Sequence, residues 1–280
     1  MTRLRVTRQA PTSHQRRRRV ARQARPPWVL VPLTVLAVGF VGLPFVALLQ
    51  RAPWRRLTDL LTEPVVTDAL RLSLIGAFAA TGLSLVVGVP LAWVLARTRF
   101  PGRSLVRALV ILPMVLPPVV GGAALLFAFG RRGLLGGPVY DASGFLLPFS
   151  TGGVIVANTF VALPFLVVTV EAGLRSADRR YEDAAATLGA GRWTVLRRVT
   201  LPMAAPSIGA GAVLCWARAL GEFGATVTFA GNLQGRTQTM PLAVFLTLES
   251  DREAAIALSL VLIAVSLAVL VPLRHRWLAV

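Results

Sequence analysis

Long apolar runs without a charged residue constrain the fold of this 280-residue chain more than any other feature. The run from Trp28 to Leu49 has 22 residues, and a helix of that length crosses about 30 Å of hydrocarbon at about 1.5 Å per residue. Comparable runs recur along the chain. Charged residues make up only 15% of it, against about 25% in soluble domains. We therefore expect a polytopic membrane protein.

Six of these runs are expected to cross the membrane as helices, because a helix satisfies its backbone hydrogen bonds internally in lipid. The predicted fold class is an all-α polytopic membrane protein with six transmembrane helices. We expect Pro117, Pro118 and Pro164 to kink their helices. The six spans form one transmembrane domain, 28–273, and lie at about 28–49, 72–96, 108–130, 152–170, 206–231 and 254–273.

Arginine distribution predicts the orientation, since cytoplasmic loops carry an excess of basic residues. The tail 1–27, the loops after the second and fourth spans, and the tail 274–280 together carry 21 arginines. The opposite side carries 7. Both termini are therefore predicted to be cytoplasmic, with 1–27 as a disordered Arg-rich tail and 274–280 as a short second tail. The bilayer is one partner, and the basic tail 1–27 is read as a topology signal that touches anionic lipid rather than as a nucleic-acid reader.

Composition also excludes several kinds of site. All 30 basic residues are arginine, so the chain lacks the lysine that a phosphate-binding ATPase loop requires. Its two histidines, His14 and His275, lie in the tails, and Cys215 is the single cysteine. We expect no metal site, no disulfide framework and no catalytic residue in this chain.

The longest polar connection is 174–205, on the predicted cytoplasmic side. Its sequence predicts two short helices that project from the membrane. A short helix is expected from Asp178 to Leu188, with acidic residues at its start that favour the helix dipole. Gly189 and Gly191 then predict a tight turn. A second short helix is expected over 193–199, ended by Pro202 and Pro206, which begin the fifth span.

This loop resembles the cytoplasmic signature of binding-protein-dependent ATP-binding-cassette importer permeases. The signature is Glu-Ala-Ala, three residues, Gly, nine residues, then Ile-x-Leu-Pro. The chain has aspartate in place of glutamate and valine in place of isoleucine, and Glu182 supplies a carboxylate one residue early. The matching positions, with that glutamate, are Glu182, Asp183, Ala184, Ala185, Gly189, Val199, Leu201 and Pro202.

The resemblance implies the importer-permease fold and a set of partners. They are a second copy of the chain, two ATP-binding-cassette ATPase subunits that dock on the loop 174–205, and an extracytoplasmic oxyanion-binding protein. ATP and Mg would bind the ATPase, so this chain carries no cofactor of its own and is not itself an enzyme. The implied location is the bacterial plasma (inner) membrane, and the implied mechanism is alternating access.

The chain from about Leu70 onward resembles molybdate/tungstate permeases in particular. The segments in which this resemblance lies are LPMVLPPVVGGAALLFAFGRRGLLG, ALPFLVVTVEAGLRSAD and WARALGEFGATVTFAGNLQGRTQTMPLAVFLTLES. Sulfate permeases share the core from Gly221 to Gly224, so sulfate or thiosulfate is the alternative substrate. A self-sufficient secondary transporter is a further alternative, but it leaves the loop 174–205 unexplained. A membrane enzyme is another, but it would need clustered histidines or carboxylates near a membrane face, and both histidines lie in the tails.

Polar residues inside the predicted spans are the candidates for the translocation path or its gate: Arg218, Glu222, Thr226, Thr228 and Asn158. Arg218 and Glu222 stand four residues apart, so on a helix they share one face and can pair. Their alternative role is an internal ion pair that fixes packing or lies at a dimer interface. For the uncharged residues the alternative role is an interhelical hydrogen bond.

Overall fold

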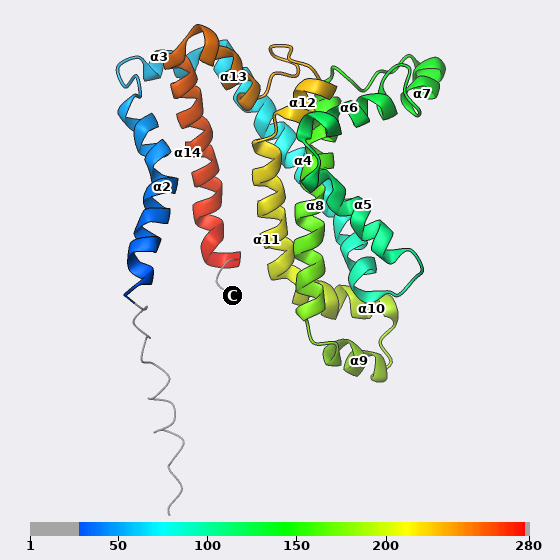
Figure 1. Ribbon diagram of the computed structural model, residues 1–280. Helices are drawn as coiled ribbons and strands as arrows, with labels where there is room; N and C mark the ends of the chain where they lie inside the picture. Colours follow the sequence, from blue (N-terminus) through cyan, green and yellow to red (C-terminus); the bar gives the residue numbers. More distant parts are fainter. Residues whose placement is uncertain (1–27, 278–280) are drawn as a thin grey trace, which may run out of the picture. The chain divides into compact units, whose positions relative to one another are not determined.

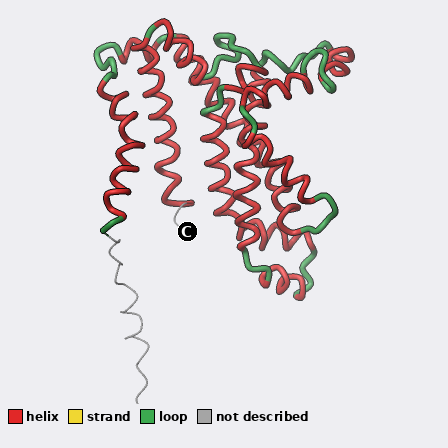
Figure 2. The backbone as a smooth tube through the Cα atoms, viewed as in Figure 1, coloured by secondary structure: helices red, strands yellow, loops and turns green. Residues whose placement is uncertain are grey.

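The computed structural model describes residues 28–277, with side chains described for 28–271. The predicted tail 1–27, and residues 278–280 of the second tail, lie outside the described residues. The described chain consists of helices and connections, with no strand (Figure 2). The described residues divide into two compact units, one that ends at Gln50 and one that begins at Arg51.

The described part of the first unit is dominated by one helix. Helix α2 (Leu30–Gln50) has 21 residues, an apolar sequence and no buried residue. A helix that exposes apolar side chains all around in a single chain fits a lipid environment.

The second unit holds the remaining helices (Figure 1). The long ones are α4 (Pro64–Arg97), α8 (Thr151–Ser176), α11 (Leu201–Leu220) and α14 (Arg252–Trp277). The shorter ones are α3 (Leu57–Thr62), α5 (Arg103–Val115), α6 (Pro118–Phe129), α7 (Gly136–Ser143), α9 (Arg180–Thr187), α10 (Arg192–Val195), the π turn η1 (Leu196–Thr200), α12 (Gly224–Phe229) and α13 (Met240–Ser250).

Helix α8 is the centre of this unit, because both α4 and α11 pack along it. The largest buried cluster lies at this three-helix contact and includes Leu95, Leu166 and Trp216. Close packing depends on small residues: a Cβ on Gly88 would lie 2.9 Å from side-chain carbons of both Leu163 and Leu166. Small residues allow helix backbones to approach closely where lipid provides no hydrophobic drive.

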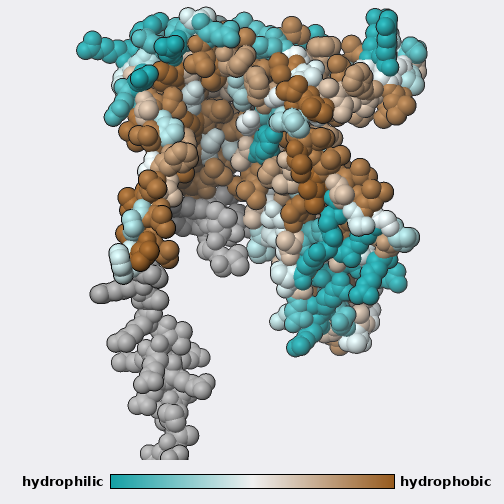
Figure 3. Space-filling model, viewed as in Figure 1, coloured by the Kyte–Doolittle hydropathy of each residue, from teal (hydrophilic) through white to brown (hydrophobic). Residues whose placement is uncertain are grey.

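Five described helices are long and apolar enough to span a membrane, and a sixth span results if α5 and α6 count as one bent span. This confirms the predicted all-α polytopic fold, with five or six candidate spans. In the space-filling view, brown apolar residues form the middle of the second unit and teal polar residues gather at the end with α9 and α10 (Figure 3).

The third predicted span, 108–130, is not one kinked helix. Helix α5 ends at Val115, α6 begins at Pro118, and their axes differ by 119°. The physical reason is the proline pair: Leu116 and Pro117 take extended conformations with ψ of 140° and 131°. A residue before proline is disfavoured in the helical region, so two successive positions leave the helix.

The fifth predicted span, 206–231, also differs from the structure. Helix α11 begins at Leu201 and ends at Leu220, and the short helix α12 follows after a break. The predicted helix over 193–199 does not end at Pro202; residues from Arg192 to Leu220 form a continuous helical segment of 29 residues. The π turn η1 precedes Pro202, and its wider backbone accommodates the missing proline N–H without ending the helix.

Candidate functional site

The loop 174–205 projects from the end of α8 as α9, a tight turn and α10, and leads through η1 into α11. Gly189 makes the turn possible, with φ at +84° in the left-handed region that a β-carbon disfavours. Because α10, η1 and α11 are continuous, this loop has a direct helical connection to the membrane-spanning part of α11.

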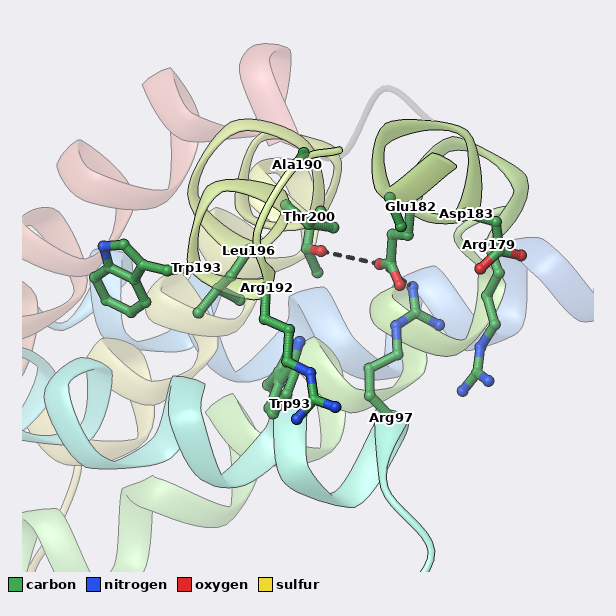
Figure 4. A pocket seen from close by; sticks show the side chains of 12 residues that line it. Trp93, Arg97, Arg179, Glu182, Asp183, Ala190, Arg192, Trp193, Leu196 and Thr200 are labelled. Atoms are coloured by element: carbon green, nitrogen blue, oxygen red, sulfur yellow. Dashed lines mark hydrogen bonds and ion pairs between the residues drawn. The ribbon is translucent and has the colours of Figure 1, made fainter. Parts of the chain in front are cut away.

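Glu182 faces inward in this loop (Figure 4). Its Oε1 accepts a hydrogen bond from Arg97 Nη2 at 2.9 Å and another from Thr200 Oγ1 at 3.0 Å. The Arg97 and Glu182 side chains are only 7% and 17% exposed. One carboxylate therefore joins the last residue of α4, helix α9 and the π turn η1.

The other signature residues are mostly accessible. Asp183, Ala184, Gly189 and Pro202 are exposed, whereas Ala185, Val199 and Leu201 are half-buried. Of these two adjacent acidic residues, Glu182 therefore faces the helix bundle and Asp183 faces solvent. Large apolar side chains also face outward from the loop: Tyr181, Leu188 and Trp193 are 63%, 88% and 66% exposed.

A cavity of about 640 Å³ lies between the end of α4 and the loop. Its wall from α4 consists of Trp93 and Arg97, and the remaining walls come from α9 with the preceding Arg179, the turn at Ala190, α10 and η1 (Figure 4). Packing between the loop and α4 is therefore incomplete, and the Arg97–Glu182 pair bridges the two beside this cavity.

The predicted Arg218–Glu222 pair is present, with Arg218 Nη1 at 2.6 Å from Glu222 Oε2. Glu222 lies just beyond the end of α11 and is 1% exposed, while Arg218 is 26% exposed. The other carboxylate oxygen, Oε1, accepts the backbone N–H of Ala225 at 2.8 Å, in the first turn of α12. Glu222 thus joins α11 to α12 across the break.

Asn158 and Thr226 meet in the interior, where Thr226 Oγ1 donates to Asn158 Oδ1 at 3.2 Å. Both are buried, on α8 and α12. Thr228 is half-buried and donates to the backbone carbonyl of Gly224 in its own helix. The structure therefore brings two of the three uncharged candidates into contact with each other and leaves Thr228 apart.

Replacing Asn158 by leucine is expected to lower stability by about 1–3 kcal/mol, because the Thr226 hydroxyl would be left buried without its partner. The measurement is equilibrium unfolding of the detergent-solubilised chain, with Thr159→Val as the matched control. Thr159 is adjacent, and among the described residues its hydroxyl bonds only the carbonyl of Ile155 in its own helix, so its variant should stay within about 0.5 kcal/mol. Unchanged stability of Asn158→Leu together with lost transport would contradict the packing role and favour a path contact.

Sequence reasoning missed two polar links. Arg97 and Thr200 were not singled out, since partners 85 and 18 residues from Glu182 leave no local signal. A second link joins α5 to α8: the 8% exposed Glu171 pairs with Arg107 of α5 and, at 2.9 Å, with Arg175 one turn along its own helix. The i,i+4 spacing of Glu171 and Arg175 was the available sequence signal.

Residues 88–279 match the model of the family described as "Binding-protein-dependent transport system inner membrane component". That match covers more than half of the chain. The chain belongs to this family. It is therefore a permease subunit of an ATP-binding-cassette importer, a transport component of the inner membrane with several apolar spans.

Two curated relatives refine the comparison within this permease family. The molybdenum transport system permease protein ModB of Mycobacterium tuberculosis is 49% identical over 90% of this chain and 94% of that protein. The sulfate transport system permease protein CysT of Escherichia coli is 38% identical over 86% of this chain and 84% of that protein. The predicted resemblance to the molybdate permease type is confirmed.

Among solved structures, a chain of a bacterial ABC transporter that imports the acidic polysaccharide alginate is similar to this permease. Its TM-score is 0.68 at 18% identity, and the match covers 88% of this chain and 92% of that chain. At this identity the likeness concerns the fold, and it confirms the predicted importer-permease fold.

Proposed function

We propose that this permease subunit carries molybdate, or the similar tungstate, into the cytoplasm. The observation that carries this proposal is the 49% identity to a molybdenum permease along nearly the whole length of both proteins. The 38% identity to a sulfate permease keeps sulfate or thiosulfate as the second candidate. All of these substrates are oxyanions, so the chemistry required of the path is similar.

The proposed assembly contains two copies of this chain, two ATPase subunits and an extracytoplasmic oxyanion-binding protein. The family description supports the binding protein, and the absence of lysine from the chain supports a separate ATPase that binds ATP and Mg. The arginine distribution supports cytoplasmic termini and a cytoplasmic loop 174–205. Its exposed Leu188 and Trp193 offer an apolar contact surface to the ATPase.

The proposed coupling follows from the continuous helical segment between Arg192 and Leu220. A displacement of the loop by the ATPase would tilt α11 as one body, which is the rigid-body kind of transition that alternating access requires. The break between Leu220 and Gly224, held by Glu222, then separates the moving α11 from α12.

Pairing of Arg218 with Glu222 supports a path lined by neutral groups. An unpaired arginine would hold a dianion strongly, whereas conduction requires that the ion leave again. With its charge compensated at 2.6 Å, Arg218 serves helix packing, and hydroxyl groups such as that of Thr228 remain the candidates for transient contacts.

The coupling role of the loop predicts that Gly189→Asp abolishes most transport. A β-carbon in the left-handed conformation costs about 1–2 kcal/mol, so the turn that joins α9 to α10 would be displaced. The measurement is molybdate accumulation in cells that lack their own molybdate permease. The matched control is Gly191→Asp, because Gly191 has an ordinary φ of −62° and open space around it.

We expect the intact chain and Gly191→Asp to restore accumulation, and Gly189→Asp to fail despite a normal amount in the membrane. Normal accumulation with Gly189→Asp would contradict coupling through this turn. Excess sulfate is the second arm of the experiment. Accumulation that is indifferent to sulfate supports molybdate, and accumulation abolished by sulfate moves the substrate to sulfate.

A further inference from the structure

The contact of Glu182 with Arg97 connects the loop 174–205 to a second membrane helix besides α11. Arg97 is the last residue of α4, and its guanidinium reaches Glu182 at 2.9 Å beside the 640 Å³ cavity (Figure 4). Thr200 donates to the same carboxylate oxygen from η1 at 3.0 Å. We name these three residues, Arg97, Glu182 and Thr200, the α4 clamp.

Apart from the α4 clamp, the loop 174–205 has little packing against α4. Helix α9 packs against α10 and η1, and the cavity separates part of it from Trp93 and Arg97 of α4. A further contact is the hydrogen bond from Arg179 Nη2 to the Ala96 carbonyl, at 3.4 Å and therefore weak. The short, charge-assisted contact of Arg97 with Glu182 is the stronger connection between α4 and the loop.

Low exposure makes this connection stiff. The Arg97 side chain is 7% exposed, and its Nε is buried without a hydrogen-bond partner among the described residues. A buried guanidinium that leaves its carboxylate loses compensation for its charge, so the two groups stay together when the loop moves.

Helix α4 is suited to carry such a motion to the opposite side of the membrane. It has 34 residues, about 50 Å of helix, and packs along α8 for much of its length. Toward its other end, Ser73 Oγ accepts the backbone N–H of Met240 at 2.7 Å, the first residue of α13. A displacement at Arg97 therefore has a helical connection to the segment before α13.

We propose that Arg97 is a positioning residue for transport, which makes α4 follow the loop so that one ATPase stroke moves α4 and α11 together. This inference rests on the proposed function, since it presumes an ATPase that displaces the loop. Without the α4 clamp, the stroke would tilt α11 alone, and ATP would be hydrolysed with less molybdate moved.

The test is the number of molybdate ions imported per ATP hydrolysed, measured for the complete complex with its ATPase and binding protein in proteoliposomes. The variant is Arg97→Gln, which removes the charge and leaves a shorter polar side chain. We expect ATP hydrolysis to persist while the import ratio falls about fivefold, the size found for one residue on a coupling path. The control is Arg99→Gln, because Arg99 is exposed and forms no ion pair among the described residues.

Two further variants keep the test decisive if Arg97→Gln fails to assemble. Thr200→Val removes one hydrogen bond of the α4 clamp and should lower the ratio by about twofold. The exchange of Arg97→Glu with Glu182→Arg restores opposite charges, so its ratio should exceed that of either single variant. A merely structural pair would lower hydrolysis and import in proportion and leave the ratio unchanged.

The outcomes distinguish this inference from the proposed function. If the intact chain shows no ATP-dependent molybdate import, the proposed function fails, whatever the variants do. If the intact chain imports molybdate and the Arg97→Gln or Thr200→Val complex keeps the intact ratio, only the role of the α4 clamp is overturned.

Discussion

Arg218→Met is expected to destabilise the permease by about 3–5 kcal/mol, because it leaves the Glu222 carboxylate buried without its counter-ion. Glu222 is 1% exposed, and its ion pair with Arg218 is 2.6 Å long. The carboxylate also holds the first turn of α12 through Ala225, so its displacement would loosen the α11–α12 junction. The measurement is equilibrium unfolding of the purified chain in detergent.

The double variant Arg218→Met with Glu222→Gln separates packing from gating. Glutamine keeps an oxygen for the Ala225 N–H and removes the uncompensated charge, so most of the lost stability should return. Retained transport in this double variant would agree with the packing role. A double variant that is stable yet transports nothing would contradict that role and place the pair at the gate.

Gly122→Val is expected to cost about 3 kcal/mol or more, since the contact of α6 with α12 leaves no space for a side chain. A Cβ on Gly122 would lie 2.8 Å from both the Ala225 carbonyl oxygen and the Thr228 Cβ. Backbone on the facing helix cannot move alone, so the two helices would have to separate.

Gly82→Val is the matched control for this prediction. Gly82 also lies within a helix, α4, but a β-carbon added to it would have open space within 4 Å. Valine is the better helix former there, so stability should hold or rise slightly. Equal losses at both positions, measured by unfolding in detergent, would contradict the close α6–α12 contact.

The fold class could be predicted from the sequence, because long apolar runs such as 28–49 and 254–273 are visible there directly and predict membrane-spanning helices. The proline pair indicated a kink near residue 117, but not its angle of 119°, since α5 packs on α8 while α6 packs mainly on α12. The continuity of α10 with α11 was missed, since Pro202 ordinarily ends a helix and the π turn before it has no sequence signal.

In the candidate site, too, some features could be predicted from the sequence and others could not. Gly189 and the Arg218–Glu222 pair follow from local spacing, and the structure has both the left-handed turn and the ion pair. The inward direction of Glu182 depends on Arg97, a residue 85 positions away, so only the packing of α4 beside α9 reveals it. The roles of these residues in transport stay predictions until the variants above are measured.

ATP-driven molybdate import by this permease is tested by the accumulation of labelled molybdate in proteoliposomes. The samples contain this chain with its ATPase and binding protein, the same complex without ATP, and this chain alone. We predict accumulation against a gradient only with the complete complex and ATP. Accumulation by the chain alone, or by the complex without ATP, would rule out ATP-driven import and identify a self-sufficient secondary transporter.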